Sequence, residues 1–400
     1  MVGPHGWARV AVAAALLAGC TGSTTPGASG TPGATTTPAP TTTGTPNPDA
    51  GKTWAEACRA GEPAPGTWVH DVATTASEVV VAGELPPDPS GTAGPRALWR
   101  SPDAVTWRRT DLPTNAADFP RTLAARGDLV VVGGAAGEDD AALAWTADAS
   151  GAWSRSELLA DAGVFGAAAG PTGFVMVGTA GRHTDAARPA IWSSADGGRW
   201  QRVEPMSDGR LYGSFDDVVN TGSRFIAFGQ VSPTPIPALA DFPIPDDRRY
   251  EGVPWISEDG VAWRPLDAPG LFAWAHISAI AVAPGRLTAL GWLTSPTDGK
   301  RTPAGWASSD GLAWTRIALH GTVQVGPVTT AVADSDGRIV AFGDGSEPGG
   351  FWVSDDGVAW EAVVASLFTD ATISAVTGFG QRFVAVGLRP ETCGVWSSPA

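Results

Sequence analysis

The chain repeats a short stretch, Ser257-Glu258-Asp259-Gly260-Val261-Ala262-Trp263, whose skeleton is Ser-x-Asp-x-x-x-Trp. Four further copies keep this spacing and a looser fifth carries one extra residue: Ser101–Trp107, Ser194–Trp200, Ser308–Trp314, Ser354–Trp360 and Thr146–Trp153. The copies recur at roughly 45 to 60 residues between strand-like runs, a period typical of a β-propeller or a similar array. We call each copy a box.

Each box contains the parts of a tight turn. The carboxylate of its Asp can accept backbone N–H groups of the turn, and in four copies the next residue is a Gly, which supplies a positive φ. The Trp then begins the next strand and packs inward, where its ring buries about 150–250 Å². We therefore interpret the box carboxylates as structural rather than catalytic: Asp103, Asp196, Asp259, Asp310 and Asp356.

The box resembles the Asp-box (BNR) repeat of sialidases, sortilin-type receptors and some xyloglucan-degrading hydrolases. The resemblance covers nearly all of residues 68–400. It implies a propeller fold, but enzymes and binding proteins share this repeat, so it does not imply an activity.

Short β-rich runs between the boxes predict the number of blades. Seven second strands end in Gly, the first at 78–83 and the last at 383–387, and seven third strands end in Trp, from Trp99 to Trp396. We predict an all-β, seven-bladed propeller of four-stranded antiparallel blades over residues 51–400. Box turns should lie on one face, and the second-to-third and unit-to-unit loops on the other.

The two ends of the chain are expected to close this ring. The last unit stops before its fourth strand, and the segment 66–69 is the predicted replacement. A ring closed by strands from both termini has no free edge. In an exported chain, Cys58 and Cys393 should then form a disulfide.

The N-terminal 50 residues predict export and anchoring. Residues 1–19 have the basic start and short apolar run of a signal peptide, and residues 17–20 resemble the bacterial lipoprotein cleavage box. Cys20 would be lipidated, although an ordinary signal peptide ending near a Cys is the alternative. Residues 20–50 are rich in Thr, Pro and Gly and predict a disordered tether. These features place the head outside the cell, held to the outer face of the membrane by lipid alone.

The net charge and the motifs of the sequence limit the classes of partner that we expect. The formal net charge of −15 argues against nucleic acid. No phosphate-binding loop, Ser/His/Asp signature or cluster of metal ligands appears in the sequence, so we expect no cofactor and no metal. We expect a monomer that meets an envelope or extracellular protein or glycan.

Candidate ligand residues come from aligning the seven first strands. One equivalent position near the channel mouth holds His70, Arg121, Phe165, Asp216, Ser278, Thr330 and Ser374, and Asp71 and Asp217 follow two of these. The long blade 4 loop, 230–253, adds Arg248 and Tyr250, and Trp274 lies in an aromatic loop whose Phe272 and Trp274 either stack a sugar or pack in the core. Solvated strand ends at a wet channel mouth are the alternative explanation of the whole set.

Two functions remain open from these residues. The first is a cell-surface head that binds a protein or glycan on its loop face without catalysis. The second is an extracytoplasmic glycoside hydrolase whose candidate carboxylates are Asp71, Asp216 and Asp217. Sialidases similar in repeat use a Tyr nucleophile, and this chain has only Tyr212 and Tyr250 and lacks the Phe-Arg-Ile-Pro signature. An envelope assembly factor similar to propeller chaperones is a third, smaller option.

Overall fold

The computed structural model describes residues 54–58, 62–115, 118–137, 141–147, 151–181, 187–203, 211–232, 252–319, 328–334, 336–343, 350–380 and 382–398. The predicted signal peptide, Cys20 and the tether lie outside these ranges, as do Arg248 and Tyr250. Among the described residues, no helix has the length and apolar character that a membrane crossing requires.

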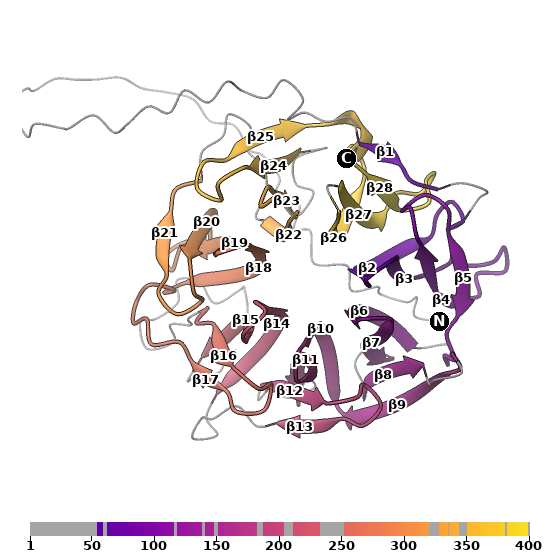
Figure 1. The fold of residues 1–400 in the computed structure, drawn as a ribbon, viewed down its shortest axis with the longest axis horizontal. Coiled ribbons are helices and arrows are strands. Elements are labelled where there is room, and N and C mark those ends of the chain that lie inside the picture. The colour runs from indigo at the N-terminus through magenta and orange to yellow at the C-terminus, as the bar shows by residue number, and fades with distance from the viewer. Residues whose placement is uncertain are drawn as a thin grey trace, which may run out of the picture. The chain divides into compact units, whose positions relative to one another are not determined.

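Seven four-stranded antiparallel sheets form a ring, which confirms the predicted seven-bladed propeller (Figure 1). The innermost strands are β2 (Trp68–Thr74), β6 (Asp118–Arg126), β10 (Ala162–Gly170), β14 (Tyr212–Asn220), β18 (Ala275–Ala283), β22 (Val328–Ala333) and β26 (Thr372–Phe379). The second strands are β3 (Val79–Glu84), β7 (Leu129–Ala136), β11 (Gly173–Ala180), β15 (Phe225–Ser232), β19 (Arg286–Thr294), β23 (Ile339–Gly343) and β27 (Arg382–Leu388). We number the blades 1 to 7 in this order.

Each blade is completed by two further strands, and one short 3-10 helix, η2 (Ser366–Phe368), follows blade 6. The third strands are β4 (Arg96–Ser101), β8 (Ala141–Ala147), β12 (Arg188–Ser194), β16 (Trp255–Ser257), β20 (Arg301–Ser308), β24 (Gly350–Ser354) and β28 (Val395–Ser397). The outermost strands are β5 (Arg108–Asp111), β9 (Trp153–Ala160), β13 (Gln201–Val203), β17 (Arg264–Pro265), β21 (Thr315–Ile317), β25 (Glu361–Val364) and β1 (Ala55–Glu56).

The hydrophobic core is divided among the seven gaps between neighbouring blades. For example, one cluster joins Leu98 of blade 1 to Val130 of blade 2, and another joins Phe228 of blade 4 to Ile277 of blade 5. Both faces of a middle strand are therefore buried, which explains runs such as Val79–Ala82 that are apolar without alternation. No blade can bury its faces without its neighbours.

Ring closure depends on a short N-terminal segment, 54–58, which we call the clasp. Its strand β1 is the outermost strand of blade 7, with Ala55 paired to Ser397. The prediction that 66–69 supplies this strand was wrong, because Trp68 begins the innermost strand of blade 1. The ring uses a two-residue strand, too short for a period-2 pattern to reveal it.

Side chains on both sides of β1 strengthen the closure. Trp54 packs against four aromatic rings between blades 6 and 7: Phe342, Phe351, Phe368 and Phe383. Cys58 and Cys393 form the predicted disulfide, with Cα atoms 6.4 Å apart. The Glu56 carboxylate accepts the backbone N–H of Cys393 at 3.0 Å. Glu56, Cys58 and Cys393 lie close enough together to suggest a metal site. Both thiols are bonded to each other in the disulfide, however, so we interpret the group as a covalent closure of the ring.

The described boxes share one hydrogen-bonded turn. In blade 4 the Asp259 Oδ1 accepts the N–H groups of Val261 and Ala262, each at 2.8 Å, and the Ser257 hydroxyl at 3.0 Å. The N–H of Ala262, followed by that of Val261, lowers the pKa of Asp259 below its ordinary value. The same two N–H acceptances recur at the other four box carboxylates, Asp103, Asp196, Asp310 and Asp356.

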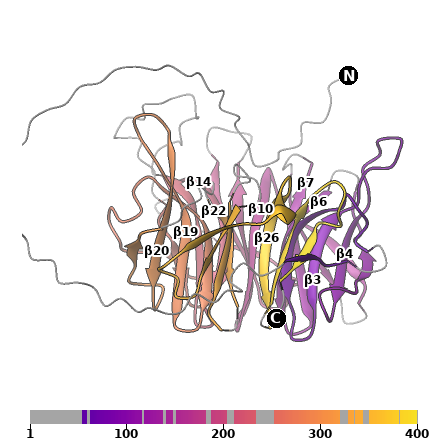
Figure 2. The same cartoon turned by 90° about the horizontal axis from the view of Figure 1, so that it is seen from above.

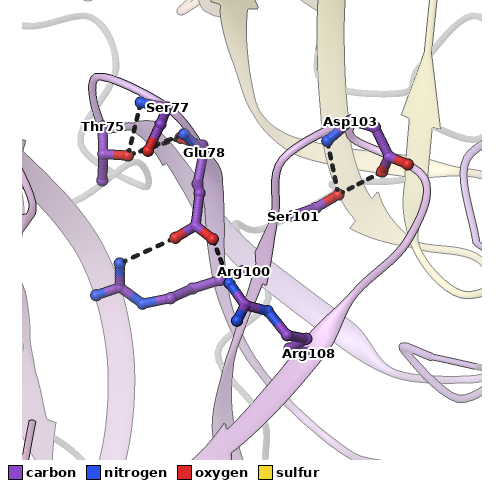
Figure 3. Close-up of polar contacts among 7 residues, drawn as sticks. All are labelled: Thr75, Ser77, Glu78, Arg100, Ser101, Asp103 and Arg108. Carbon is purple, nitrogen blue, oxygen red and sulfur yellow. Dashed lines mark hydrogen bonds and ion pairs between the residues drawn. The ribbon is translucent and has the colours of Figure 1, made fainter.

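The blade 1 box shows how the turn is tied to its blade (Figure 3). Ser101 Oγ donates to Asp103 Oδ1 at 2.9 Å. Close by, the Glu78 carboxylate forms ion pairs with Arg100, at 3.5 Å, and with Arg108. These contacts join β3, β4 and β5 within one blade.

The two faces of the ring differ in their connections. Turns from first to second strands and the box turns lie on one side, which we call the box face. The longer connections extend from the opposite side, the loop face (Figure 2). This is the division that alternating antiparallel strands require.

Candidate functional site

Every innermost strand carries one extra residue relative to its neighbour. The pairing register shifts by one within each of these strands, which is the signature of a β-bulge. The extra residues are His70, Arg121, Phe165, Asp216, Ser278, Thr329 and Ser374. Six of these are the residues that sequence alignment placed at one equivalent position. In blade 6 the position belongs to Thr329, so the predicted Thr330 is wrong by one residue.

The bulges separate core packing from the inner surface of the ring. The residue before each bulge is buried, as are Val69, Phe215 and Ile277, and the seven bulge residues themselves are half-buried. A bulge re-aims a side chain and bends the strand locally. The seven innermost strands surround the ring axis (Figure 1). The bulges lie between the first residue and the middle of each strand, and the first residues are at the loop face. We call this set the bulge ring.

On blades 1 to 3 the bulge ring is basic and aromatic. Burial, with Arg121 and then Arg96 as further causes, lowers the pKa of His70 from its ordinary value to about 3, so His70 is neutral at physiological pH. Burial also lowers the pKa of Arg121. The Arg121 guanidinium carbon lies 5.5 Å from the centre of the Phe165 ring, which gives a cation–π contact between blades 2 and 3.

On blades 4 and 5 an acidic residue meets an aromatic stack. The Asp216 Oδ2 lies 3.0 Å from His276 Nε2, and its Oδ1 accepts the Ser214 hydroxyl at 3.0 Å. His276 stacks on Trp292 with ring centres 4.0 Å apart and planes 10° apart. Arg301 places its guanidinium 4.9 Å from the Trp292 ring centre. We call Asp216, His276, Trp292 and Arg301 the blade 5 stack.

Sequence reasoning missed most of the blade 5 stack. His276 and Trp292 are direct partners in the β18–β19 ladder, so their contact depends on register and not on a motif. The bulge at Ser278 puts His276 one residue farther from the β18–β19 turn than Trp292 is, so simple counting from the turn does not pair them. Only the bulge fixes which residue of β14 meets them.

The acidic residues that follow two of the bulges bind backbone. Asp71 Oδ1 accepts the N–H of Val72 at 2.8 Å, and its Oδ2 accepts the N–H of Leu123 in blade 2 at 2.7 Å. Asp217 Oδ1 accepts the N–H of Val218 at 2.7 Å. Asp217 also packs so closely on Gly166 that a Cβ there would lie 2.5 Å from its Cα. This geometry is that of carboxylates that join strands and blades.

The hydroxyl side chains of blades 5 and 6 also turn to backbone. Ser278 Oγ donates to the carbonyls of Val328 and Leu290. Thr329 Oγ1 lies 3.2 Å from the carbonyl of Gly343. These residues connect blades and strands, and this leaves the charged and aromatic groups of blades 1 to 4 as the chemically richer part of the bulge ring.

The predicted aromatic loop before β18 divides between core and surface. Phe272 is fully buried in the core between blades 4 and 5, so it cannot stack a sugar. Trp274 is half-buried and has a positive φ of 59°. Its carbonyl accepts the N–H of Thr294 at 2.9 Å, which fixes this turn against β19.

A hollow of about 270 Å³ lies elsewhere, beside the blade 4 box. Arg224, Glu258 and Arg264 are among its lining residues. It is formed by the box turn itself, on the face opposite to the bulge ring.

Comparison with known proteins supports the fold. No protein-family model matches the chain, and no curated protein matches it. Among solved structures, streptogramin B lyase aligns with a TM-score of 0.56 at 10% identity, covering 86% of this chain and 96% of that one. The β-propeller domain of the Trilobed protease from Pyrococcus furiosus aligns at 0.49 and 13% identity, covering 84% and 96%. A Trypanosoma rangeli sialidase aligns at 0.45 and 12%, covering 83% and 54%. At these identities the chain is similar to propeller proteins in fold alone.

Proposed function

We propose that this chain is a non-catalytic binding head, carried on a lipid-anchored tether at the outer face of the cell membrane. The bulge ring would hold one protein or glycan ligand on the loop face. The observation that carries this proposal is the bulge repeated in all seven innermost strands. Its preceding residues are uniformly buried, whereas its own residues differ in chemistry from blade to blade.

The engagement of the acidic residues supports binding over catalysis. Both oxygens of Asp71 accept backbone N–H groups, and Asp217 Oδ1 accepts another. A general acid or nucleophile needs a carboxyl oxygen directed at the substrate, and these three oxygens are directed at backbone N–H groups of the propeller itself. The same bonds suit a rigid frame around a ligand.

The test is binding by ring variants of the full-length chain. The wild type would be screened against a glycan array and envelope proteins, and every hit would be titrated with the purified ligand. Arg121→Ala and Asp216→Ala should each weaken binding at least about tenfold, the loss expected from one charge-assisted contact. Glu258→Gln, an exposed change on the box face, should bind as the wild type does. Equal affinity in all four proteins would refute a site at the bulge ring.

The blade 5 stack favours one alternative, a glycoside hydrolase. Asp216 and His276 form an acid–base pair at 3.0 Å beside the half-buried Trp292, a residue type on which sugars stack. In that case the wild type would release reducing sugar from an envelope polysaccharide, and Asp216→Asn would abolish release while keeping affinity for the sugar. Absence of turnover by the wild type across such substrates would exclude this alternative.

A further inference from the structure

One side of blade 1 presents a row of polar and aromatic groups to blade 2. Trp68, Glu84 and Arg96 are direct partners across three adjacent strands, so their side chains emerge on the same face of the sheet. The Arg96 guanidinium carbon lies 5.2 Å from the centre of the Phe119 ring in blade 2. The row therefore faces the gap between these blades, near the loop face.

Three nitrogen atoms in this gap are buried without a hydrogen-bond partner. They are Trp68 Nε1, His70 Nε2 and Arg96 Nε. The rings of Trp68 and His70 are 4.8 Å apart, and Arg96 is only 3% exposed. Buried N–H groups are nearly always paired in folded proteins, and the Trp68 and Arg96 atoms always carry a hydrogen, so the group indicates a missing acceptor, to which His70 adds a donor in its Nε2–H tautomer.

The electrostatics of the gap favour an anionic acceptor. Arg121 and Arg96 both act on His70 and help to keep it neutral. Glu84 approaches Arg96 at 3.4 Å, which leaves the Arg96 Nε–H unused. Burial raises the pKa of Glu84, an effect that Arg96 partly offsets. A carboxylate is a small planar anion whose two oxygens accept charge-assisted hydrogen bonds from guanidinium N–H groups.

We propose that the gap between blades 1 and 2 is a binding subsite for a single carboxylate group. Trp68 Nε1, Arg96 Nε and the neutral His70 would donate to its oxygens, with Arg121 supplying charge. This inference rests on the proposed function, because it names the chemistry of one part of the ligand that the bulge ring would hold. Its test must therefore be independent of any natural ligand.

The probe is acetate, titrated into the ¹⁵N-labelled full-length chain. Indole and Arg Nε–H resonances report directly on two of the three unpartnered groups. We expect the Trp68 and Arg96 resonances to shift and saturate with acetate, and not with chloride at equal ionic strength. Linear, unsaturated shifts, or equal shifts with chloride, would overturn the proposal in favour of buried water. Tighter binding of inorganic phosphate would overturn the assignment to carboxylates.

Variants identify the donors. Trp68→Phe and Arg96→Gln should each weaken acetate binding about tenfold, since each removes one N–H donor to a charged acceptor. Trp153→Phe, on the outer strand of blade 2, and the exposed Arg316→Gln are matched controls that should bind acetate as the wild type does. Where Arg96→Gln fails to fold, Trp68→Phe alone decides, and unchanged acetate affinity in it would refute the subsite. Loss of acetate binding in these variants with natural-ligand binding unchanged would refute the assignment of this subsite to the ligand and leave the proposed function standing.

Discussion

Gly260 shows how strongly a box constrains a single residue. Its φ is +78°, and a Cβ added there would lie 2.9 Å from Val175 Cγ2 in the preceding blade. We expect Gly260→Ala to lower the free energy of unfolding by about 2–4 kcal/mol, since it combines left-handed strain with overpacking. Urea denaturation measures this loss.

Substitution of Gly222 separates backbone strain from overpacking as causes of the loss. Its φ is +90°, and an added Cβ would meet nothing within 4 Å. Gly222→Ala should therefore cost only the strain, about 1 kcal/mol. Equal losses at Gly222 and Gly260 would show that blade-to-blade crowding does not contribute to the box.

His70 should make the stability of the ring depend on pH. Its folded pKa, about 3, lies below the ordinary 6.5, so between these values the unfolded chain binds a proton that the folded chain does not. Stability from this group is fully present above pH 6.5 and decreases as the pH falls toward 3. We expect His70→Gln to flatten the dependence of the thermal midpoint on pH between 7 and 5.

The box carboxylates do not contribute to the change in stability between pH 7 and 5. Their lowered pKa values, as at Asp259, contribute stability that is present above about pH 3.8 and is lost only at lower pH. A slope between pH 7 and 5 that is the same in His70→Gln and the wild type would contradict the buried neutral state of His70.

At the scale of strands, Asp71 ties β2 of blade 1 to β6 of blade 2 through the Leu123 N–H. Asn keeps one acceptor oxygen but replaces the other by an NH₂ group, which cannot accept a backbone N–H. Asp71→Asn should therefore lower the free energy of unfolding by about 1–2 kcal/mol. Binding of the natural ligand should change little. Asp128→Asn, in an exposed turn, is the control for stability. Normal stability with lost binding would make Asp71 a ligand residue instead of a connector.

The sequence predicted strands better than it predicted contacts between them. Short apolar runs ending in Gly or Trp identified all seven blades, because burial on both faces leaves a continuous signal. The alignment of innermost strands found six bulge positions, since the apolar residue before each is fixed by the core. Thr329 was missed because two adjacent Thr residues fit the position equally, and His276 with Trp292 was missed because cross-strand register is not written in either strand alone.

At the scale of the whole molecule, the clasp compensates for a ring with no independent blades. The disulfide links residues 335 apart in sequence. Replacing both Cys58 and Cys393 by Ser should lower the free energy of unfolding by up to about 5–6 kcal/mol in the chain-entropy estimate. Denaturant unfolding of the oxidised proteins measures the difference.

Reduction supplies the control for that experiment. Adding a reductant should bring the wild type to the stability of the double variant, and should leave the double variant unchanged. A reductant effect of similar size in the double variant would assign the loss to a cause other than the bridge.

The ring closure, blade count and disulfide were all predictable, but the closing strand was not. Alternation cannot identify a two-residue strand, and the segment 66–69 carried a stronger strand pattern than Ala55–Glu56 did. What marks β1 is its surroundings: Trp54 among four aromatic rings and Cys58 in its bridge. Those are tertiary facts.

The position of the clasp sets an order of events during synthesis. A ribosome makes residues 54–58 before any blade, yet their partners in β28 are translated last. Trp54 packs on rings of blades 6 and 7, and Cys58 bonds to Cys393, so neither side chain has these partners until the last two blades are made. The first strand of the ring to be made is therefore the last one to pair. A chain that ends before residue 395 lacks β28, so it has at most six complete blades and its ring does not close.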